Sequence, residues 1–212
     1  MLSGGASKRM KTDKARLQIE RQGRRHTLLS WTLHRIRQVV PEIAVMDGGH
    51  GHLDGLDHAR DGVRALPDGP GGGPAAGLLG AWADAPERQL LVLASDLPQV
   101  PVSLLEEIVS TAQNTRADWV LTRVEQRLQP LCALYGPAVR SELEEAVATG
   151  QRGLWSLYDR TRLHRVVLES RALRAFGDPK ALLRNVNTEA DYRSLPGASR
   201  PSQIESASTP TE

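Results

Sequence analysis

The chain has 212 residues, of which 40% are hydrophobic and 25% charged, a composition typical of one globular domain with a substantial core. A net charge of +2 argues against a strongly basic nucleic-acid-binding protein, and no apolar run reaches the roughly 20 residues that span a membrane. The single cysteine excludes an intrachain disulfide, and no signal-peptide-like stretch opens the chain, so we expect a cytoplasmic protein.

Apolar runs typical of strands alternate along the chain with segments of helical periodicity. The expected strands are Ile43–Met46, Val63–Leu66, Leu90–Ala94, Trp119–Leu121 and Leu131–Leu134, and the expected helices are Thr27–Val39, Ala75–Ala85, Val102–Ala112 and Pro137–Ala148. This alternation favours an α/β fold with a mainly parallel central sheet, in which ligands bind where the strands end. The Ser-, Pro- and Thr-rich segment 196–212 predicts a disordered tail after a domain over residues 1–195.

The opening segment, Leu2 to Lys14, reads LSGGASKRMKTDK. Gly4 and Gly5 allow close approach of the backbone to a ligand, and successive amides in such a loop can bind an anion. Arg9 and Lys14 could then neutralise a triphosphate. The Walker and dinucleotide-binding patterns are both absent, and the alternative is a flexible basic arm.

Residues 8–37 contain ten Lys or Arg but only Asp13 and Glu20 as acidic residues. Such a segment favours a phosphate-rich partner, either a nucleotide or a nucleic acid. No aromatic platform is interleaved with these charges, which disfavours nucleic acid.

A glycine-rich stretch runs from Asp68 to Gly77 after a strand-like run. Pro74 suits the first turn of a helix, where its missing N–H has no cost. The stretch containing Asp68 and Gly73 is therefore either a plain connector or a loop placed against the base or sugar of a nucleotide.

Asp96 ends the apolar run that begins at Leu90. A carboxylate at the end of such a strand can hold Mg²⁺ against phosphate oxygens. The alternative is that Ser95 or Asp96 caps the next helix.

Near the end of the domain, Asn185 and Asn187 flank a valine. On a strand the two amides would point to the same side and could bind a substrate. Thr188 and Asp191 have the spacing of a helix-capping pair, which is a structural explanation of the same segment.

The remaining reactive side chains give weaker signals. His50 and His52 have no further metal-ligand residues beside them, which favours a solvent-exposed loop over a zinc site. Cys132 lies in an apolar run and is expected to be a buried structural thiol.

Taken in order, these segments resemble the molybdenum cofactor guanylyltransferase family of Rossmann-like nucleotidyltransferases. The pattern L-x-G-G-x-S-x-R-M-x-x-D-K is matched from Leu2 to Lys14, G-P-x-A-G from Gly73 to Gly77, D-x-P from Asp96 to Pro98, Q-P-L-x-A-L-Y from Gln129 to Tyr135, and N-V-N-T from Asn185 to Thr188. Each motif alone is weak, but the ordered set is specific and covers nearly the whole chain except the tail.

The resemblance implies a three-layer Rossmann-like fold and an enzyme that transfers GMP from GTP to molybdopterin, releasing pyrophosphate, with Mg²⁺ as cofactor. It allows partners among molybdoenzymes or other cofactor-assembly proteins, but no nucleic acid and no membrane. By this resemblance, the catalytic residues of the chain would be Arg9, Lys14 and Asp96, and Asp96 would bind the metal. The implied nucleotide-binding residues are Leu2, Ser3, Gly4, Gly5, Lys14, Asp47, Asp68, Gly73 and Asp96, and the implied acceptor-binding residues are Asn185 and Asn187.

The sequence departs from the family pattern in three places. Met1 and Leu2 stand where relatives carry a full first strand, so the first strand is expected to be truncated, through a misassigned start or an unusually short strand. Lys11 replaces the usual glycine after Met10. Asp47 stands where the family often has an asparagine that touches the nucleotide.

The implied chemistry is an in-line displacement, in which a phosphate oxygen of molybdopterin attacks the α-phosphorus of GTP. An ionised phosphate needs no dedicated general base, so catalysis would rest on positioning and charge stabilisation. Related cytidylyl enzymes show Ala-Ala-Gly where this chain has Ser3-Gly4-Gly5, which favours guanine. Transfer from CTP or to a sugar phosphate, and a non-catalytic nucleotide-binding paralogue, are the alternatives.

Overall fold

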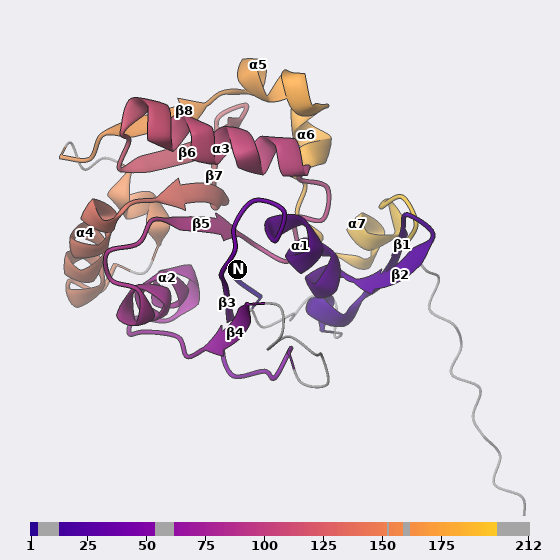
Figure 1. The fold of residues 1–212 in the computed structure, drawn as a ribbon, viewed down its shortest axis with the longest axis horizontal. Coiled ribbons are helices and arrows are strands. Elements are labelled where there is room, and N and C mark those ends of the chain that lie inside the picture. The colour runs from indigo at the N-terminus through magenta and orange to yellow at the C-terminus, as the bar shows by residue number, and fades with distance from the viewer. Residues whose placement is uncertain (4–12, 54–61, 152, 159–161, 199–212) are drawn as a thin grey trace, which may run out of the picture.

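The computed structural model describes residues 1–3, 13–53, 62–151, 153–158 and 162–198, and Figure 1 shows strands with helices on both sides. The elements in chain order are η1 (Lys14–Arg16), β1 (Gln18–Arg21), β2 (Arg24–Thr27), α1 (Leu28–Ile36), β3 (Ile43–Met46), β4 (Val63–Leu66), α2 (Gly73–Asp84), β5 (Leu90–Leu93), α3 (Val102–Thr115), β6 (Trp119–Val124), β7 (Arg127–Tyr135), α4 (Pro137–Ala148), η3 (Leu154–Leu157), β8 (Arg165–Leu168), α5 (Ser170–Leu173), η4 (Arg174–Phe176), α6 (Pro179–Leu182) and α7 (Glu189–Arg193).

The strands run mainly in one direction. β3 pairs with β4 in parallel, and β8 pairs with β6 in parallel. β5 and β6 are both antiparallel to β7, so they are parallel to each other and β7 alone is reversed among them. Leu2 forms parallel bridges to Met46 at the end of β3 and to Ala94 after β5. Leu2 therefore connects the pair β3–β4 to the sheet β5–β7–β6–β8, and the predicted mainly parallel α/β fold is confirmed.

Neighbouring strand residues point alternately into two hydrophobic cores. Leu93 and Val120 face the core that contains the apolar residues of α1 and α3. Val92 and Leu121 face the core that contains the apolar residues of α2 and α4. Helices thus cover both faces of the sheet, as the predicted three-layer arrangement requires. Cys132 is fully buried, and burial raises the pKa of its thiol to about 12, which confirms a structural role.

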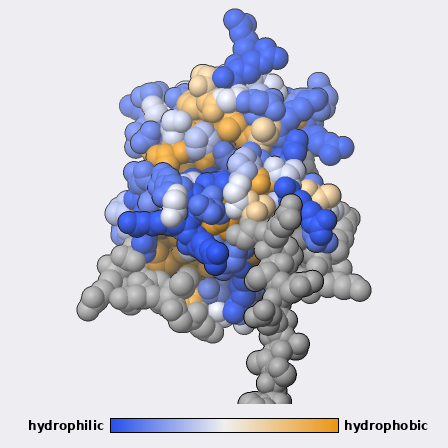
Figure 2. Space-filling model, turned by 90° about the vertical axis from the view of Figure 1, so that its right-hand side faces the viewer, coloured by the Kyte–Doolittle hydropathy of each residue, from blue (hydrophilic) through white to orange (hydrophobic). Residues whose placement is uncertain are grey.

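A third, smaller core lies under the hairpin β1–β2, on the side of the molecule that Figure 2 shows, where hydrophobic residues are scattered among hydrophilic ones. Ile19 of β1 packs there with Trp31 of α1 and Tyr192 of α7. This hairpin gives no apolar pattern in the sequence, because its strands are rich in charged residues. Its one direct signal is the turn at Gln22 and Gly23, both of which have positive φ.

The chain just before the C-terminal end of the described residues lies against the hairpin. The amide of Glu20 donates to the carbonyl of Gly197 at 2.7 Å, and Ala198 bridges to Ile19. The rest of the predicted tail, residues 199–212, lies outside the described residues, so the predicted boundary at residue 195 remains a prediction. In the described part of the chain, no helix has the length and apolarity needed to cross a membrane.

Candidate active site

A pocket of about 430 Å³ lies at the carboxyl ends of β3, β5 and the short bridge at Leu2, which is the edge where α/β folds bind ligands. Its lining includes predicted site residues from four separate segments: Leu2, Ser3, Lys14, Asp68, Gly73 and Asp96. Asp47 directly precedes Gly48, which also lines the pocket. The predicted residues Gly4, Gly5 and Arg9 lie outside the described residues.

Lys14 is held at the pocket by residues far away in sequence. Its ammonium donates to Oδ1 of Asn187 at 2.7 Å. The preceding residue, Asp13, caps the short helix η1, because its carboxylate accepts from the amide of Ala15. Lys14 also interacts electrostatically with Asp96. The ammonium of Lys14 therefore interacts with both the side-chain amide of Asn187 and the carboxylate of Asp96.

Asp96 is a carboxylate of the pocket that is largely removed from water. Burial raises the pKa of Asp96 above its usual value, and the positive charge of Lys14 only partly offsets this. The carbonyl oxygen of Asp96 accepts from the amide of Val186 at 2.9 Å, which joins this loop to the segment that carries both asparagines. The helix-cap alternative for Ser95 or Asp96 is wrong, because α3 begins after Pro101 and has no side-chain cap.

Two buried side-chain oxygens, Oδ1 of Asp96 and Oδ1 of Asn185, have no hydrogen-bond partner among the described residues. A carboxylate and an amide oxygen are ligands that a hard divalent cation prefers. The described residues contain no group of three or more His, Cys, Asp or Glu that could hold a metal. A cation bound by Asp96 would therefore take most of its other ligands from a substrate or water.

The segment with Asn185 and Asn187 is not a strand, so the expectation that the two residues lie on a strand is wrong. Asn187 binds Lys14, whereas the amide oxygen of Asn185 is buried without a partner. The alternative explanation for the end of this segment is confirmed: Thr188 caps α7 and forms a capping box with Asp191.

Asp47 and Asp68 differ in their environments. The carboxylate of Asp47 accepts from the amides of Gly49 and His52 at 2.9 and 2.8 Å. Burial alone would raise the pKa of Asp47, but these hydrogen bonds bring it below its usual value. Asp68 is exposed at the pocket, and its pKa is raised by partial burial and by the charge of Asp47. Asp47 therefore has a structural task in its own loop, and Asp68 is the carboxylate presented to the pocket.

His52 contacts two residues of the pocket, Ser3 and Asp13, and its sequence context did not indicate this. Its side chain is buried, so the expectation of a solvent-exposed loop is wrong for this residue. Its Nδ1 lies 2.9 Å from Oγ of Ser3, and its Nε2 lies 2.9 Å from Oδ2 of Asp13. One imidazole therefore joins the residues that flank segment 4–12. His50 stacks on it with ring centroids 5.6 Å apart and lines the pocket.

The glycine-rich stretch before α2 is more than a connector, since Gly73 and Pro74 line the pocket. Gly71, Gly72 and Gly73 all have positive φ, which residues with a Cβ rarely adopt. A Cβ on Gly77 would lie 2.4 Å from the Leu2 side chain, so glycine lets α2 approach the start of the chain.

Arg35 of α1 fixes the loop that follows Asp96. Its buried guanidinium donates to the carbonyl of Leu97 at 3.2 Å and to the carbonyl of Val100. Trp31, one turn earlier, donates to the carbonyl of Pro98 at 3.1 Å. These hydrogen bonds give α1 a positioning role that its amphipathic pattern did not indicate.

Comparison with known proteins gives one consistent family. A family model described as "MobA-like NTP transferase domain" matches residues 1–166. The chain is 34% identical over 199 residues to a protein of Mycobacterium avium named "Probable molybdenum cofactor guanylyltransferase", with 92% of each chain covered. It is 31% identical over 194 residues to a protein of the same name from Pelotomaculum thermopropionicum, covering 90% of this chain and 87% of that one.

Solved structures agree on the fold. The crystal structure of molybdopterin-guanine dinucleotide biosynthesis protein A from Archaeoglobus fulgidus matches with a TM-score of 0.72 at 24% identity, covering 90% of this chain and 92% of that chain. The structure of Rv0371C from Mycobacterium tuberculosis in complex with manganese matches with a TM-score of 0.60 at 22% identity, covering 91% and 93%.

Proposed function

Because the chain belongs to the family of MobA-like NTP transferase domains and is a nucleotidyltransferase, we propose that it transfers GMP from GTP to molybdopterin, releasing pyrophosphate. The names of its relatives support this reaction. The observation that carries the proposal is the meeting of Lys14, Asp96 and Asn187 at one pocket on the carboxyl edge of the sheet.

In this proposal the protein positions two phosphate groups and stabilises charge. The ammonium of Lys14 balances the negative charge that grows on the departing pyrophosphate, together with Arg9 from the opening segment. Asp68 and Gly73 line the same pocket, and we propose that the base and ribose rest against them. The attacking phosphate of molybdopterin is already ionised, so the site needs no general base.

The buried oxygens of Asp96 and Asn185 have no hydrogen-bond partner, and this supports the binding of a divalent cation, which we take to be Mg²⁺. Such a cation would neutralise charge on the phosphates of GTP. A relative of the same fold has been solved with manganese, which is consistent with a divalent metal. The binding of Lys14 to Asn187 would orient the ammonium toward the phosphates, and we propose that the acceptor lies on this side of the pocket.

The test is incubation of the purified protein with GTP, Mg²⁺ and molybdopterin, followed by mass spectrometry of the product. We expect the guanine dinucleotide and one pyrophosphate per transfer. GTP should support pyrophosphate release, whereas CTP, UTP and ATP should not. Binding of GTP without product, under conditions in which a known relative turns over, would contradict the proposal.

We further propose a cytoplasmic location, where GTP is available to such an enzyme.

A further inference from the structure

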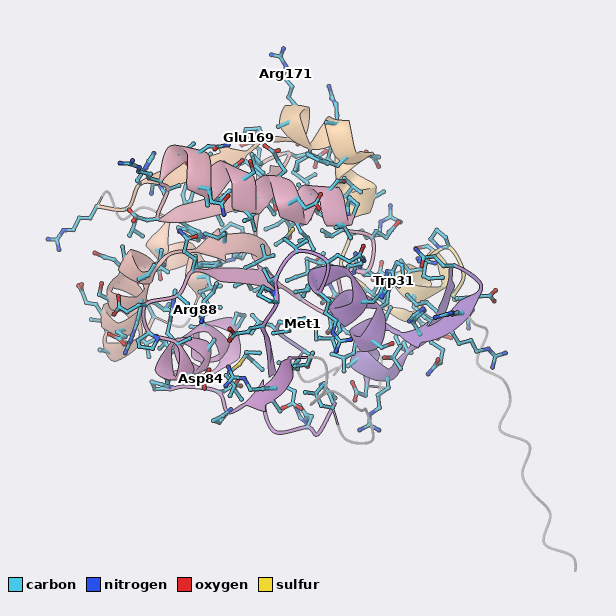
Figure 3. All side chains as sticks on the ribbon, in the orientation of Figure 1. Met1, Trp31, Asp84, Arg88, Glu169 and Arg171 are labelled. Carbon is cyan, nitrogen blue, oxygen red and sulfur yellow. The ribbon has the colours of Figure 1, made fainter. Side chains whose placement is uncertain are left out.

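His50 is an exposed residue of the pocket to which the proposed transfer gives no task. Figure 3 shows Met1 in the middle of the molecule, and the next two residues, Leu2 and Ser3, line the same pocket. The imidazole of His50 therefore stands at a central site. Among the described residues, its ring nitrogens have no hydrogen-bond partner, so they can bind a ligand.

A tight turn fixes the backbone of His50. The amide of His50 donates to the carbonyl of Asp47 at 3.3 Å. The two residues between them, Gly48 and Gly49, have positive φ, as in a type I′ turn. The imidazole also stacks on the buried ring of His52. The turn and this ring contact together hold the imidazole at the pocket.

The imidazole of His50 and the carboxylate of Asp68 border one open space. A Cβ on Gly48 would stand 3.7 Å from Nε2 of His50 and 3.7 Å from Oδ2 of Asp68, so glycine keeps this space clear. The two groups also interact electrostatically. Burial and the charge of Asp47 raise the pKa of Asp68, and the imidazole partly opposes this rise. Like the ring nitrogens, the carboxylate of Asp68 has no hydrogen-bond partner in the described part of the chain.

A nitrogen donor beside two carboxylate oxygens matches the Watson–Crick edge of guanine. That edge presents, in order, the O6 acceptor, the N1–H donor and the donors of the 2-amino group. The negative charge of Asp68 favours a proton on the nearby Nε2 of His50, which can then donate to O6, while the carboxylate accepts from the other two groups. Cytosine and adenine present a donor in place of O6, and uracil presents an acceptor in place of the 2-amino group. Each of these bases would set like groups against each other, which lowers affinity.

We propose that His50 is a specificity-determining residue, which donates from Nε2 to O6 of guanine while Asp68 accepts from N1 and from the 2-amino group. The proposal rests on the proposed function, because it requires the base of GTP to lie against Asp68. It gives the preference for guanine a physical cause that is separate from the Ser3-Gly4-Gly5 motif.

The experiment measures nucleotide binding to the full chain by titration calorimetry, which needs no acceptor. His50→Phe keeps a ring that can stack but removes the N–H. In 6-thio-GTP a sulfur, which is a weak acceptor, replaces O6, whereas ITP lacks only the 2-amino group. We expect the unmodified protein to bind GTP roughly tenfold more tightly than 6-thio-GTP, and His50→Phe to lose most of this difference. The preference for GTP over ITP should survive His50→Phe, which shows a folded site, and be lost in Asp68→Ala.

Two further variants serve as controls. His50→Gln supplies another N–H donor and should restore part of the lost preference for GTP over 6-thio-GTP. His34 is also an exposed imidazole stacked on an aromatic ring, that of Trp31, but it does not belong to the pocket lining. His34→Phe should therefore bind each nucleotide as the unmodified protein does.

A preference for GTP over 6-thio-GTP that His50→Phe retains in full would overturn this inference and leave the proposed transfer standing. An unmodified protein that binds CTP, UTP or ATP as tightly as GTP would overturn the inference together with the proposed function.

Discussion

The substitution Asp96→Asn separates the proposed role of this carboxylate from its effect on stability. It keeps the size of the side chain and removes its negative charge. If Asp96 holds the cation, kcat/KM for pyrophosphate release should fall by a factor on the order of 10²–10³, the loss typical for removing one main electrostatic contributor. The free energy of unfolding of the metal-free protein should increase instead.

The sign follows from the environment of Asp96. Burial raises its pKa and Lys14 only partly lowers it, so the folded protein binds the proton more tightly than the unfolded chain does. The free energy of unfolding therefore decreases as pH rises from the unfolded pKa of an aspartate, about 3.9, through the higher folded pKa, and it stays lower above that value. Removing the charge relieves the cost of burying the carboxylate, and the lost attraction to Lys14 offsets part of that gain.

We therefore expect Asp96→Asn to stabilise the metal-free protein by about 1 kcal/mol at pH 7, or about 2–4 °C in Tm for a chain of this size. The gain should shrink as pH falls through the folded pKa and should vanish below the unfolded pKa, where the carboxyl is protonated in both states. Thermal melts between pH 4 and 8 with a chelator measure this, with the exposed Glu106→Gln as matched control. A lower Tm at pH 7, or turnover near that of the unmodified enzyme, would refute the reasoning.

Three further substitutions test the positioning residues. Lys14→Ala should lower kcat/KM by roughly 10²-fold or more, because the leaving pyrophosphate loses its cation, and near-normal turnover would exclude that role. His52→Phe keeps a buried ring but breaks the link between the two ends of the opening segment, so kcat/KM for GTP should fall roughly tenfold while Tm changes little; unchanged GTP kinetics would contradict this role. Gly80→Ala would place a Cβ 2.3 Å from the carbonyl of Pro67 and 2.9 Å from the amide of Gly69. The overpacking cost of about 1–3 kcal/mol should outweigh the gain of about 1 kcal/mol in helix propensity, so Tm should fall; a rise measured by calorimetry would show that the loop yields freely.

Local pattern was enough for several of the elements. β3, β4 and α4 begin and end at the predicted residues, because apolar runs and helical periodicity report directly on which side chains leave water. The hairpin β1–β2 escaped prediction, and helix α7 was indicated only by its capping pair, Thr188 and Asp191. Their few apolar residues form a core only with Trp31, and that contact depends on segments far apart in the chain.

The candidate site shows the same division. The sequence by itself determined which residues could carry charge and metal chemistry. The order of its motifs indicated the family, because the combination of these motifs is specific although each motif alone is weak. Only the tertiary structure decided which of them meet. It brought Lys14 to Asn187, left Asp96 and Asn185 with unpartnered oxygens, and turned Asp47 inward to its own loop. It also made His52 a buried link rather than a solvent residue. Hydrogen-bond partners are chosen by strand order and by the packing of loops across the sheet edge, and those distances are not encoded in spacing along the chain.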